Sequence, residues 1–191
     1  MKTLTEIAND IGTDKGTASG EKHNYTEVYE KYFLELKDKP VKMLEIGIWD
    51  NRFKGASPRL WTSWFTNLEF IGFEIEPEAK KLEKELGIKV FTGDQFKSED
   101  LLQAIEVHGE NYDVIIDDGV HKFDAIRISF ESLYPSLKEG GLYIIEDIHA
   151  NDARKIEDWL KENNYEYSSY CYTKRWSEGD KLIVLTKPSS H

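Results

Sequence analysis

Residues 112–121 read YDVIIDDGVH and residues 140–147 read GGLYIIED, and these two stretches decide the fold of the chain. Each contains a short apolar run, Tyr112–Asp117 and Leu142–Glu146, in which polar and apolar residues do not alternate. Runs of this kind are typical of strands that are covered on both faces. The pattern between them, over Phe123–Leu137, is helical. A strand, a helix and a second strand in this order predict two parallel strands joined by a crossover helix.

The same alternation continues on both sides of this unit. Three further strands are expected before it, over Val41–Gly47, Glu69–Glu74 and Ile88–Thr92. Ser57 is a plausible N-cap for the first of the remaining helices because Pro58 suits a first helical position. These remaining helices are expected over Pro58–Phe65, Pro77–Leu86, Ser98–His108 and Ala150–Glu162.

The last two strand-like runs differ from the others. Tyr165–Tyr172 and Lys181–Lys187 are separated by a polar loop that is too short for a crossover helix. They should therefore pair antiparallel. The predicted fold is α/β, with a seven-stranded, mostly parallel sheet, a C-terminal antiparallel pair and helices on both faces.

Length and composition favour a single domain with an acidic surface. The chain has 191 residues and a formal net charge of −11, from 36 acidic and 25 basic side chains. A basic face for a nucleic-acid backbone is not expected from this balance. The single cysteine, Cys171, excludes an intrachain disulfide and a cysteine-rich zinc site. No stretch has the apolar pattern of a signal peptide or a membrane span, so we expect a cytoplasmic protein with no membrane or nucleic-acid partner.

About forty residues precede the first predicted strand. They contain an amphipathic helix, roughly Tyr25–Leu36. Its apolar face is formed by Val28, Tyr29, Tyr32, Phe33 and Leu36. We expect residues 1–40 to form an N-terminal helical lid or cap and residues 41–188 to form the main domain, within one compact unit.

Polar residues follow the first three predicted strands. Ligands of open α/β sheets bind beyond the carboxyl ends of the strands, where the strand order reverses. The first strand ends with Glu45 and Gly47, and a glycine there allows close backbone approach to a ligand, although a tight turn would also explain it. Glu74, after the second strand, can accept hydrogen bonds from both ribose hydroxyls of an adenosine cofactor or can cap the next helix. Asp94 and Gln95, after the third, can read an adenine edge or form a plain turn.

The strongest chemical signal is a set of acidic residues at the next two strand ends. Asp117 and Asp118 follow the fourth strand, and Glu146 and Asp147 follow the fifth. Adjacent parallel strands lie about 4.8 Å apart, so these four carboxylates should meet and repel one another. Mg²⁺ takes oxygen ligands and would relieve this repulsion, whereas the alternative is that the acids cap helices or pair with lysines.

A histidine lies next to the acidic residues. Histidine side chains ordinarily titrate near neutrality, so His121 is a candidate to accept a proton from a metal-bound hydroxyl, although a lone histidine at a helix start is often only a polar surface residue. Coordination to a cation lowers the pKa of a hydroxyl group, which turns a poor nucleophile into a useful one. His149, two residues after Asp147, is a second and weaker candidate for a base.

The strand order and these motifs resemble the metal-dependent class I O-methyltransferases acting on sugars of natural products, of the macrocin, mycinamicin and novobiocin type. They also resemble the related cephalosporin hydroxylase-type proteins. The resemblance extends over roughly residues 10–150, and its matching segments are Gly12–Lys15, His23–Tyr25, Leu44–Gly47, Gly93–Gln95, Asp117–His121 and Gly140–Asp147. Each motif is common by itself, but the combination in this order is specific.

The resemblance implies a Rossmann-like class I methyltransferase fold, with S-adenosylmethionine and Mg²⁺ as cofactors. The acceptor would be a hydroxyl of a sugar or a sugar-like small molecule. Asp118, Glu146 and Asp147 match the metal ligands, and His121 matches the general base. The positions assigned to the methyl-donor cofactor are Glu45, Gly47, Glu74, Asp94, Gln95 and Asp117, together with Lys15 and Tyr25 from the segment that would close over it.

The chain departs from the family in two respects. Residues 49–55 read WDNRFKG and lack a second glycine soon after Gly47, so the contact with the methionine end of the cofactor is not predicted from this loop. Little sequence follows the fifth strand, so either the acceptor is small or a partner subunit, as in a homo-oligomer, completes its pocket. An oxygenase-associated role and a non-catalytic cofactor- or metal-binding module remain alternative functions.

Overall fold

The computed structural model describes residues 2–18, 23–50, 52–171 and 181–189. Its helices are α1 (Leu4–Ile11), α2 (Thr26–Phe33), α3 (Ala56–Trp64), α4 (Lys81–Leu86), α5 (Ser98–His108), α6 (Phe123–Leu133) and α7 (Ala150–Glu162), with short 3-10 turns at Pro77–Lys80 and Tyr134–Ser136. Its strands are β1 (Pro40–Ile46), β2 (Asn67–Glu74), β3 (Lys89–Thr92), β4 (Tyr112–Asp117), β5 (Leu137–Ile148), β6 (Tyr167–Cys171) and β7 (Lys181–Thr186).

The strands form one seven-stranded sheet in the order β3-β2-β1-β4-β5-β7-β6. The first five strands are parallel, and β7 pairs antiparallel with both β5 and β6. This arrangement confirms the predicted Rossmann-like fold of class I methyltransferases with its C-terminal antiparallel pair. The strand order reverses between β1 and β4, which is where such sheets bind ligands.

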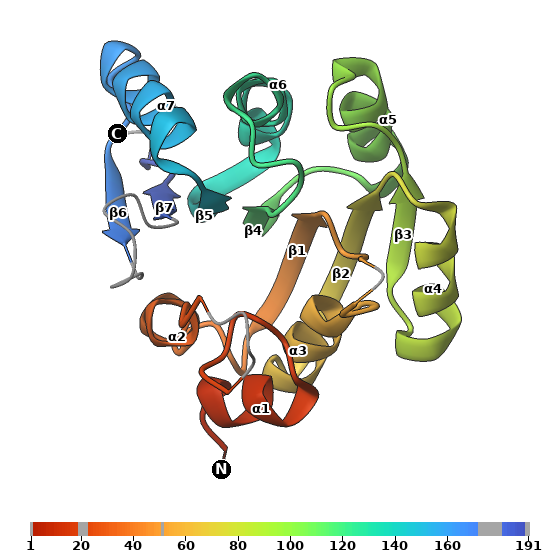
Figure 1. The fold of residues 1–191 in the computed structure, drawn as a ribbon. Helices are drawn as coiled ribbons and strands as arrows, with labels where there is room; N and C mark the ends of the chain where they lie inside the picture. Colours follow the sequence, from red (N-terminus) through yellow and green to blue (C-terminus); the bar gives the residue numbers. More distant parts are fainter. Residues whose placement is uncertain (1, 19–22, 51, 172–180, 190–191) are drawn as a thin grey trace.

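Helices cover both faces of the sheet. Figure 1 shows α5, α6 and α7 on one side and α1, α2 and α3 on the other. Each side encloses its own cluster of buried apolar side chains, because consecutive residues of the central strands point to opposite faces. Within the described part of the chain, no helix has the length and apolar character needed to cross a membrane.

The N-terminal segment belongs to one of these two cores. Tyr25, Tyr29 and Phe33 are completely buried and pack in the same cluster as Trp61 of α3. The apolar face predicted for α2 is therefore correct, although the helix ends at Phe33 and not at Leu36. Helix α1 was not predicted; it begins with a capping box between Thr3 and Glu6 and ends at Gly12 in the left-handed conformation.

Several predicted boundaries differ from the observed ones, and two of them have a clear physical reason. The helix expected over Phe123–Leu137 ends at Leu133, because Pro135 cannot continue it, and β5 already begins at Leu137. Helix α3 begins at Ala56 with Gly55 as its N-cap, so Ser57 lies inside the helix and is free to bond elsewhere.

Candidate functional site

The carboxyl ends of the parallel strands open into one cavity. It has a volume of about 520 Å³ and is lined by the β1–α3 loop, the ends of β2, β3, β4 and β5, and part of the N-terminal segment. Thr13, Asp14, Lys15 and His23 supply that N-terminal part. Parallel register explains the convergence, because Ile46 of β1 pairs with Phe73 of β2 and with Asp117 of β4.

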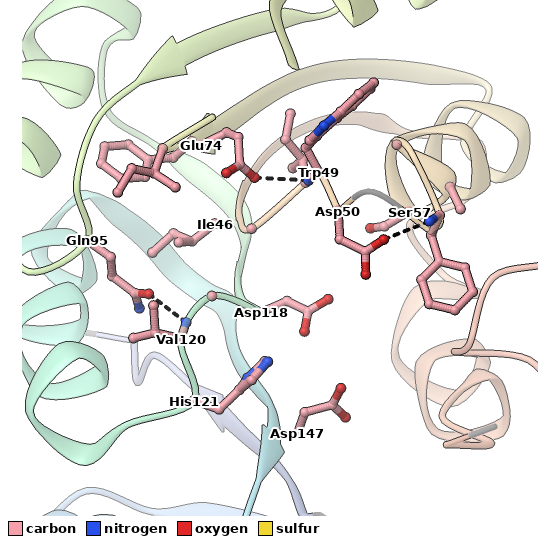
Figure 2. A pocket seen from close by; sticks show the side chains of 18 of the residues that line it. Ile46, Trp49, Asp50, Ser57, Glu74, Gln95, Asp118, Val120, His121 and Asp147 are labelled. Carbon is pink, nitrogen blue, oxygen red and sulfur yellow. Dashed lines mark hydrogen bonds between the residues drawn. The ribbon is translucent and has the colours of Figure 1, made fainter. Parts of the chain in front are cut away.

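Glu74 stands at the cavity wall where β2 ends. Its Oε2 accepts a hydrogen bond from the backbone N–H of Trp49 at 2.9 Å, and its Oε1 accepts one from Glu76 at 3.0 Å (Figure 2). Burial raises the pKa of this carboxyl above its usual range. Glu74 is not the cap of the next helical segment, because the N-cap of the 3-10 turn that follows is Glu76.

Gln95 lines the cavity, but other protein groups already bind its amide. Its Nε2 donates to Asp117 Oδ1 at 2.7 Å and to Ser129 Oγ at 2.8 Å. Its Oε1 accepts from the Val120 N–H at 3.0 Å (Figure 2). Asp117 is buried behind this side chain and is not part of the cavity wall. Burial raises the pKa of Asp117 to about 6.

Apolar side chains that follow the polar strand ends also line the cavity, and the sequence did not predict this role for them. Ile75, Phe96 and Val120 line the cavity, although they are 59%, 50% and 43% exposed. Asp94 also lines it and accepts a hydrogen bond from the Phe96 N–H at 3.0 Å. Large apolar side chains in solvent beside polar strand ends indicate a flat ligand surface. The signal in the sequence was an apolar residue next to each predicted polar strand end.

Glu45 lies beneath the cavity and does not line it. It is completely buried, accepts hydrogen bonds from Ser57 Oγ and from Trp61 Nε1, and lies 3.9 Å from Lys15 Nζ. Burial raises the pKa of Glu45 to about 7, although Lys15 opposes this increase. Gly47, two residues later, does line the cavity and has φ +82°.

Three of the four acids predicted to meet, Asp118, Glu146 and Asp147, lie in overlapping groups, whereas Asp117 points away to Gln95, and the N-terminal segment reaches into the cluster. Lys15 Nζ lies 2.6 Å from Asp118 Oδ2 and 2.7 Å from Glu146 Oε2. The Tyr29 hydroxyl donates to Glu146 Oε1, and the Tyr25 hydroxyl donates to Asp147 Oδ1 at 2.6 Å. Burial alone would lower the pKa of Lys15, but the attraction of Asp118, Glu146 and Glu45 raises it well above its ordinary value. The predicted pairing of strand-end acids with a lysine is therefore present for two of them.

Three groups of metal-binding side chains overlap in and beside this cluster, and one of them consists of Asp14, His23 and Asp147. One atom of each of Asp118, His121 and Asp147 lies within 4.8 Å of the others, and the same holds for Glu45, Asp118 and Glu146. Lys15 occupies the group that contains Glu45. The group that contains His121 faces the cavity, and Figure 2 shows its side chains directed toward one another. Asp118, Glu146 and Asp147 do not form a mutually close group of their own among the described residues.

His121 has the features of a functional residue. Its φ is +54°, an uncommon conformation for a residue with a side chain, and Asp147 has φ +51°. Its Nδ1 is buried and has no hydrogen-bond partner among the residues that the structure describes. A buried nitrogen acceptor or donor without a partner, beside two carboxylates, fits a site that binds a cation or a hydroxyl.

His23 is a second histidine at this site that the sequence did not single out as a site residue. Its Nδ1 lies 3.2 Å from Asp147 Oδ1, and its ring stacks on Tyr25 with a centroid distance of 5.2 Å. By contrast, His149 is exposed and does not line the cavity. The only signal for His23 was its place two residues before Tyr25 in a motif of the N-terminal segment.

Sequence comparison relates the chain to sugar O-methyltransferases. It is 34% identical over 148 residues to mycinamicin VI 2''-O-methyltransferase of Micromonospora griseorubida, which covers 76% of this chain and 36% of that protein. It is 34% identical over 132 residues to demethylmacrocin O-methyltransferase of Streptomyces fradiae, which covers 68% and 33%. The chain thus spans little more than a third of the length of these curated relatives. No family model matches it.

Comparison with solved structures supports the fold. MycE methyltransferase from the mycinamycin biosynthetic pathway, solved with Mg, SAH and mycinamycin VI, superposes with a TM-score of 0.73 at 23% identity, over 98% of this chain and 55% of that one. The O-methyltransferase TomG from Streptomyces achromogenes, solved with SAM, gives a TM-score of 0.64 at 13% identity, over 95% and 90%. Both are matched across nearly the whole of this chain, so the sheet and its covering helices are those of a class I methyltransferase.

Proposed function

Because the chain is homologous to S-adenosylmethionine-dependent sugar O-methyltransferases, we propose that it transfers a methyl group from S-adenosylmethionine to a hydroxyl of a sugar or sugar-like small molecule. The observation that carries this proposal is the place of the acidic cluster. Asp118, His121 and Asp147 open into the same cavity that Glu74 and Asp94 line, so a methyl donor and an acceptor hydroxyl can meet there. The alternatives, an oxygenase-associated role and a non-catalytic module, have no comparable support.

The half of the cavity at the ends of β2 and β3 suits the adenosine part of the cofactor. Glu74 presents a carboxylate held by two backbone N–H groups, and such a fixed acceptor suits the two ribose hydroxyls. Ile75 and Phe96 offer exposed apolar surface to the base. In this proposal Gly47 and Asp94 also contact the cofactor. Glu45, Gln95 and Asp117 support the wall from behind, since their polar atoms bind other protein groups.

The acidic residues that face the cavity suit a magnesium ion. Asp118 and Asp147 are 16% and 18% exposed and would bind it directly. Glu146 is the third carboxylate of the proposed set, and it would have to share its oxygens with Lys15 and Tyr29, which carboxylate lone pairs allow. When bound, the ion would lower the pKa of a coordinated acceptor hydroxyl.

His121 is the proposed general base. It lies beside Asp118 and Asp147, where the proton of an acceptor hydroxyl would be released, and its Nδ1 is not committed to another described group. Proton acceptance by a placed histidine contributes roughly 10²–10⁴-fold to a rate. In-line attack on the methyl group then depends mainly on positioning, which the cavity walls provide.

The N-terminal segment is proposed to close the cavity over the cofactor. Thr13, Asp14, Lys15 and His23 already line it. In this proposal residues 1–40 are the lid or cap and residues 41–188 are the methyltransferase domain. We propose that the enzyme acts in the cytoplasm, without nucleic-acid or membrane partners. A second copy of the chain is the proposed source of any further acceptor wall.

The proposal is tested by methyl transfer. The chain is incubated with methyl-labelled S-adenosylmethionine, Mg²⁺ and a panel of glycosides that carry neighbouring hydroxyls. We expect a labelled glycoside with the wild type, and no labelled product after addition of EDTA or with His121→Ala. Binding of S-adenosylmethionine without transfer to any polyol would contradict the proposed reaction and favour a non-catalytic module. A requirement for oxygen and a reductant would favour the oxygenase-associated alternative.

A further inference from the structure

A lysine lies at the centre of the buried half of the acidic cluster. Lys15 Nζ is 2.6 Å from Asp118 Oδ2, 2.7 Å from Glu146 Oε2 and 3.9 Å from Glu45 Oε1. The lysine side chain is 2% exposed, and the side chains of Glu45 and Glu146 are 0% and 1% exposed. One fixed positive charge is thus shared by three carboxylates from three neighbouring strand ends.

The carboxylates around Lys15 are spaced almost as closely as they would be around a metal ion. One oxygen of each of Glu45, Asp118 and Glu146 lies within 4.8 Å of the other two. Mg²⁺–oxygen bonds are about 2.1 Å long, so opposite ligands of one ion lie roughly 4.2 Å apart. Neighbouring ligands lie only about 3 Å apart and three ligands cannot all be opposite one another, so the three oxygens would have to move closer together to bind one ion. The ammonium of Lys15 already lies among these oxygens.

The two halves of the cluster have one residue in common. Asp118 belongs to the buried group with Glu45 and Glu146 and also to the cavity-facing group with His121 and Asp147. We propose that Lys15 takes the place of a second divalent cation, so that the cluster binds a single metal ion on its cavity side. The cavity-side ion in this inference rests on the proposed function, whereas the role of Lys15 in the buried half of the cluster does not.

A tethered ammonium suits a methyltransferase site better than a second metal ion. The methyl donor is a sulfonium cation, and every added positive charge nearby repels it. Lysine adds one charge where a metal ion would add two, and it still compensates the buried carboxylates that would otherwise repel one another. Chelators and dilution cannot remove it. Lys15 is therefore a positioning residue that fixes both the number and the place of the bound ions.

Mn²⁺ binding tests the inference without any turnover. Mn²⁺ has the ligand preferences of Mg²⁺, and calorimetry gives the number of Mn²⁺ ions bound per chain. Because Mn²⁺ is paramagnetic, electron paramagnetic resonance also detects whether two bound ions are spin-coupled neighbours. We expect one Mn²⁺ per wild-type chain and two coupled Mn²⁺ per chain of Lys15→Ala. Addition of Glu45→Gln to Lys15→Ala should return the number to one. Lys2→Ala is the matched control, since Lys2 is 65% exposed and pairs only with the surface residue Asp10; it should bind one ion.

The outcomes separate this inference from the proposed function. One ion in both the wild type and Lys15→Ala overturns the inference and leaves the proposed function intact. No ion in the wild type contradicts the proposed cavity-side ion and, with it, the single-ion inference. Circular dichroism checks folding, and Lys15→Gln, which removes the charge but keeps most of the side chain, replaces Lys15→Ala if that variant does not fold. A wild-type chain that binds two coupled ions overturns the inference directly.

Discussion

The backbone carbonyl group of Asp118 occupies the space that a side chain on Gly47 would need. A Cβ at Gly47 would lie 2.1 Å from the Asp118 carbonyl oxygen, and Gly47 has φ +82°. The close backbone contact between Gly47 and Asp118 holds the end of β1 against the loop that carries Asp118 and His121. The absence of a side chain at position 47 therefore decides where the acidic cluster lies relative to the cofactor half of the cavity.

Gly47→Ala is expected to weaken both folding and cofactor binding. Overpacking and left-handed backbone strain together should lower the free energy of unfolding by about 2–4 kcal/mol. Urea denaturation measures this loss, and calorimetry with S-adenosylmethionine measures the loss of affinity. Gly87→Ala is the matched control, since Gly87 has φ +70° and no atom lies within 4 Å of its added Cβ. It should cost only about 1 kcal/mol and leave cofactor affinity unchanged; equal effects of the two substitutions would contradict the argument.

Removal of divalent metal should stop methyl transfer and leave cofactor binding largely intact. The proposed ion contacts Asp118 and Asp147, whereas the proposed adenosine site is formed by Glu74 and Asp94 at the other strand ends. EDTA should abolish labelled product, and Mg²⁺ in excess over the chelator should restore it. The affinity for S-adenosylmethionine, measured by calorimetry with and without EDTA, should change little. A chelated enzyme with full activity would show that the acidic cluster does not act through a metal.

Asp117→Asn should change how the stability of the protein depends on pH. Burial raises the pKa of Asp117 from 3.8 to about 6 in the folded chain, so the folded state prefers the protonated form. As pH rises through this interval, the unfolded chain releases its proton first and the folded state loses stability. The difference of about two pH units corresponds to about 3 kcal/mol.

The amide of the Asp117→Asn variant cannot ionise, so the variant should gain stability over the wild type between about pH 4 and pH 7. The hydrogen bond from Gln95 Nε2 would be kept, because Asp117 Oδ1 becomes an amide oxygen that still accepts. Urea denaturation at pH 4 and at pH 7 gives the difference in unfolding free energy between the variant and the wild type at each pH. Other buried carboxyls contribute equally to both proteins, so an unchanged difference between pH 4 and pH 7 would refute a raised pKa at Asp117.

The sequence predicted those strands whose burial follows from an unbroken apolar run. β1, β2 and β4 lie close to the expected positions because most of their residues are buried on both faces, and β3 does so although only Val90 of its four residues is buried. The first part of β5 was missed because Lys138 to Gly141 have no such pattern. These residues are held by a partner far along the chain: the N–H of Gly140 donates to the carbonyl of Lys187 at 2.8 Å, and the N–H of Lys187 donates to the carbonyl of Gly141 at 2.9 Å.

The meeting of the strand-end acids was predictable, but their partners were not. Parallel pairing of β4 and β5 is a local consequence of the strand–helix–strand pattern, and it brings Asp118 near Glu146 and Asp147. Lys15 and Tyr29 lie 131 and 117 residues before Glu146. The sequence assigned Lys15 to the segment that would close over the cofactor and Tyr29 to the apolar face of a helix, and neither to the acidic residues. Only the docking of the N-terminal segment onto the sheet places their polar atoms on the Glu146 carboxylate.

His121→Asn tests the proposed base against a histidine that should not matter. The substitution removes the proton-accepting imidazole beside Asp118 and Asp147, and asparagine tolerates the φ of +54° at this position better than most residues do. Labelled methyl transfer should fall by roughly 10²–10⁴-fold, while calorimetry with S-adenosylmethionine should show an affinity near that of the wild type.

His149→Asn is the matched control for His121→Asn. His149 is exposed and is the N-cap of α7, a position that asparagine favours, so activity and stability should both be kept. Mn²⁺ titration separates two roles of His121, because loss of a base leaves metal affinity unchanged whereas loss of a ligand lowers it. Full activity of His121→Asn with loss of activity in His149→Asn would move the base to His149. Full activity of both variants would exclude these two histidines as the base.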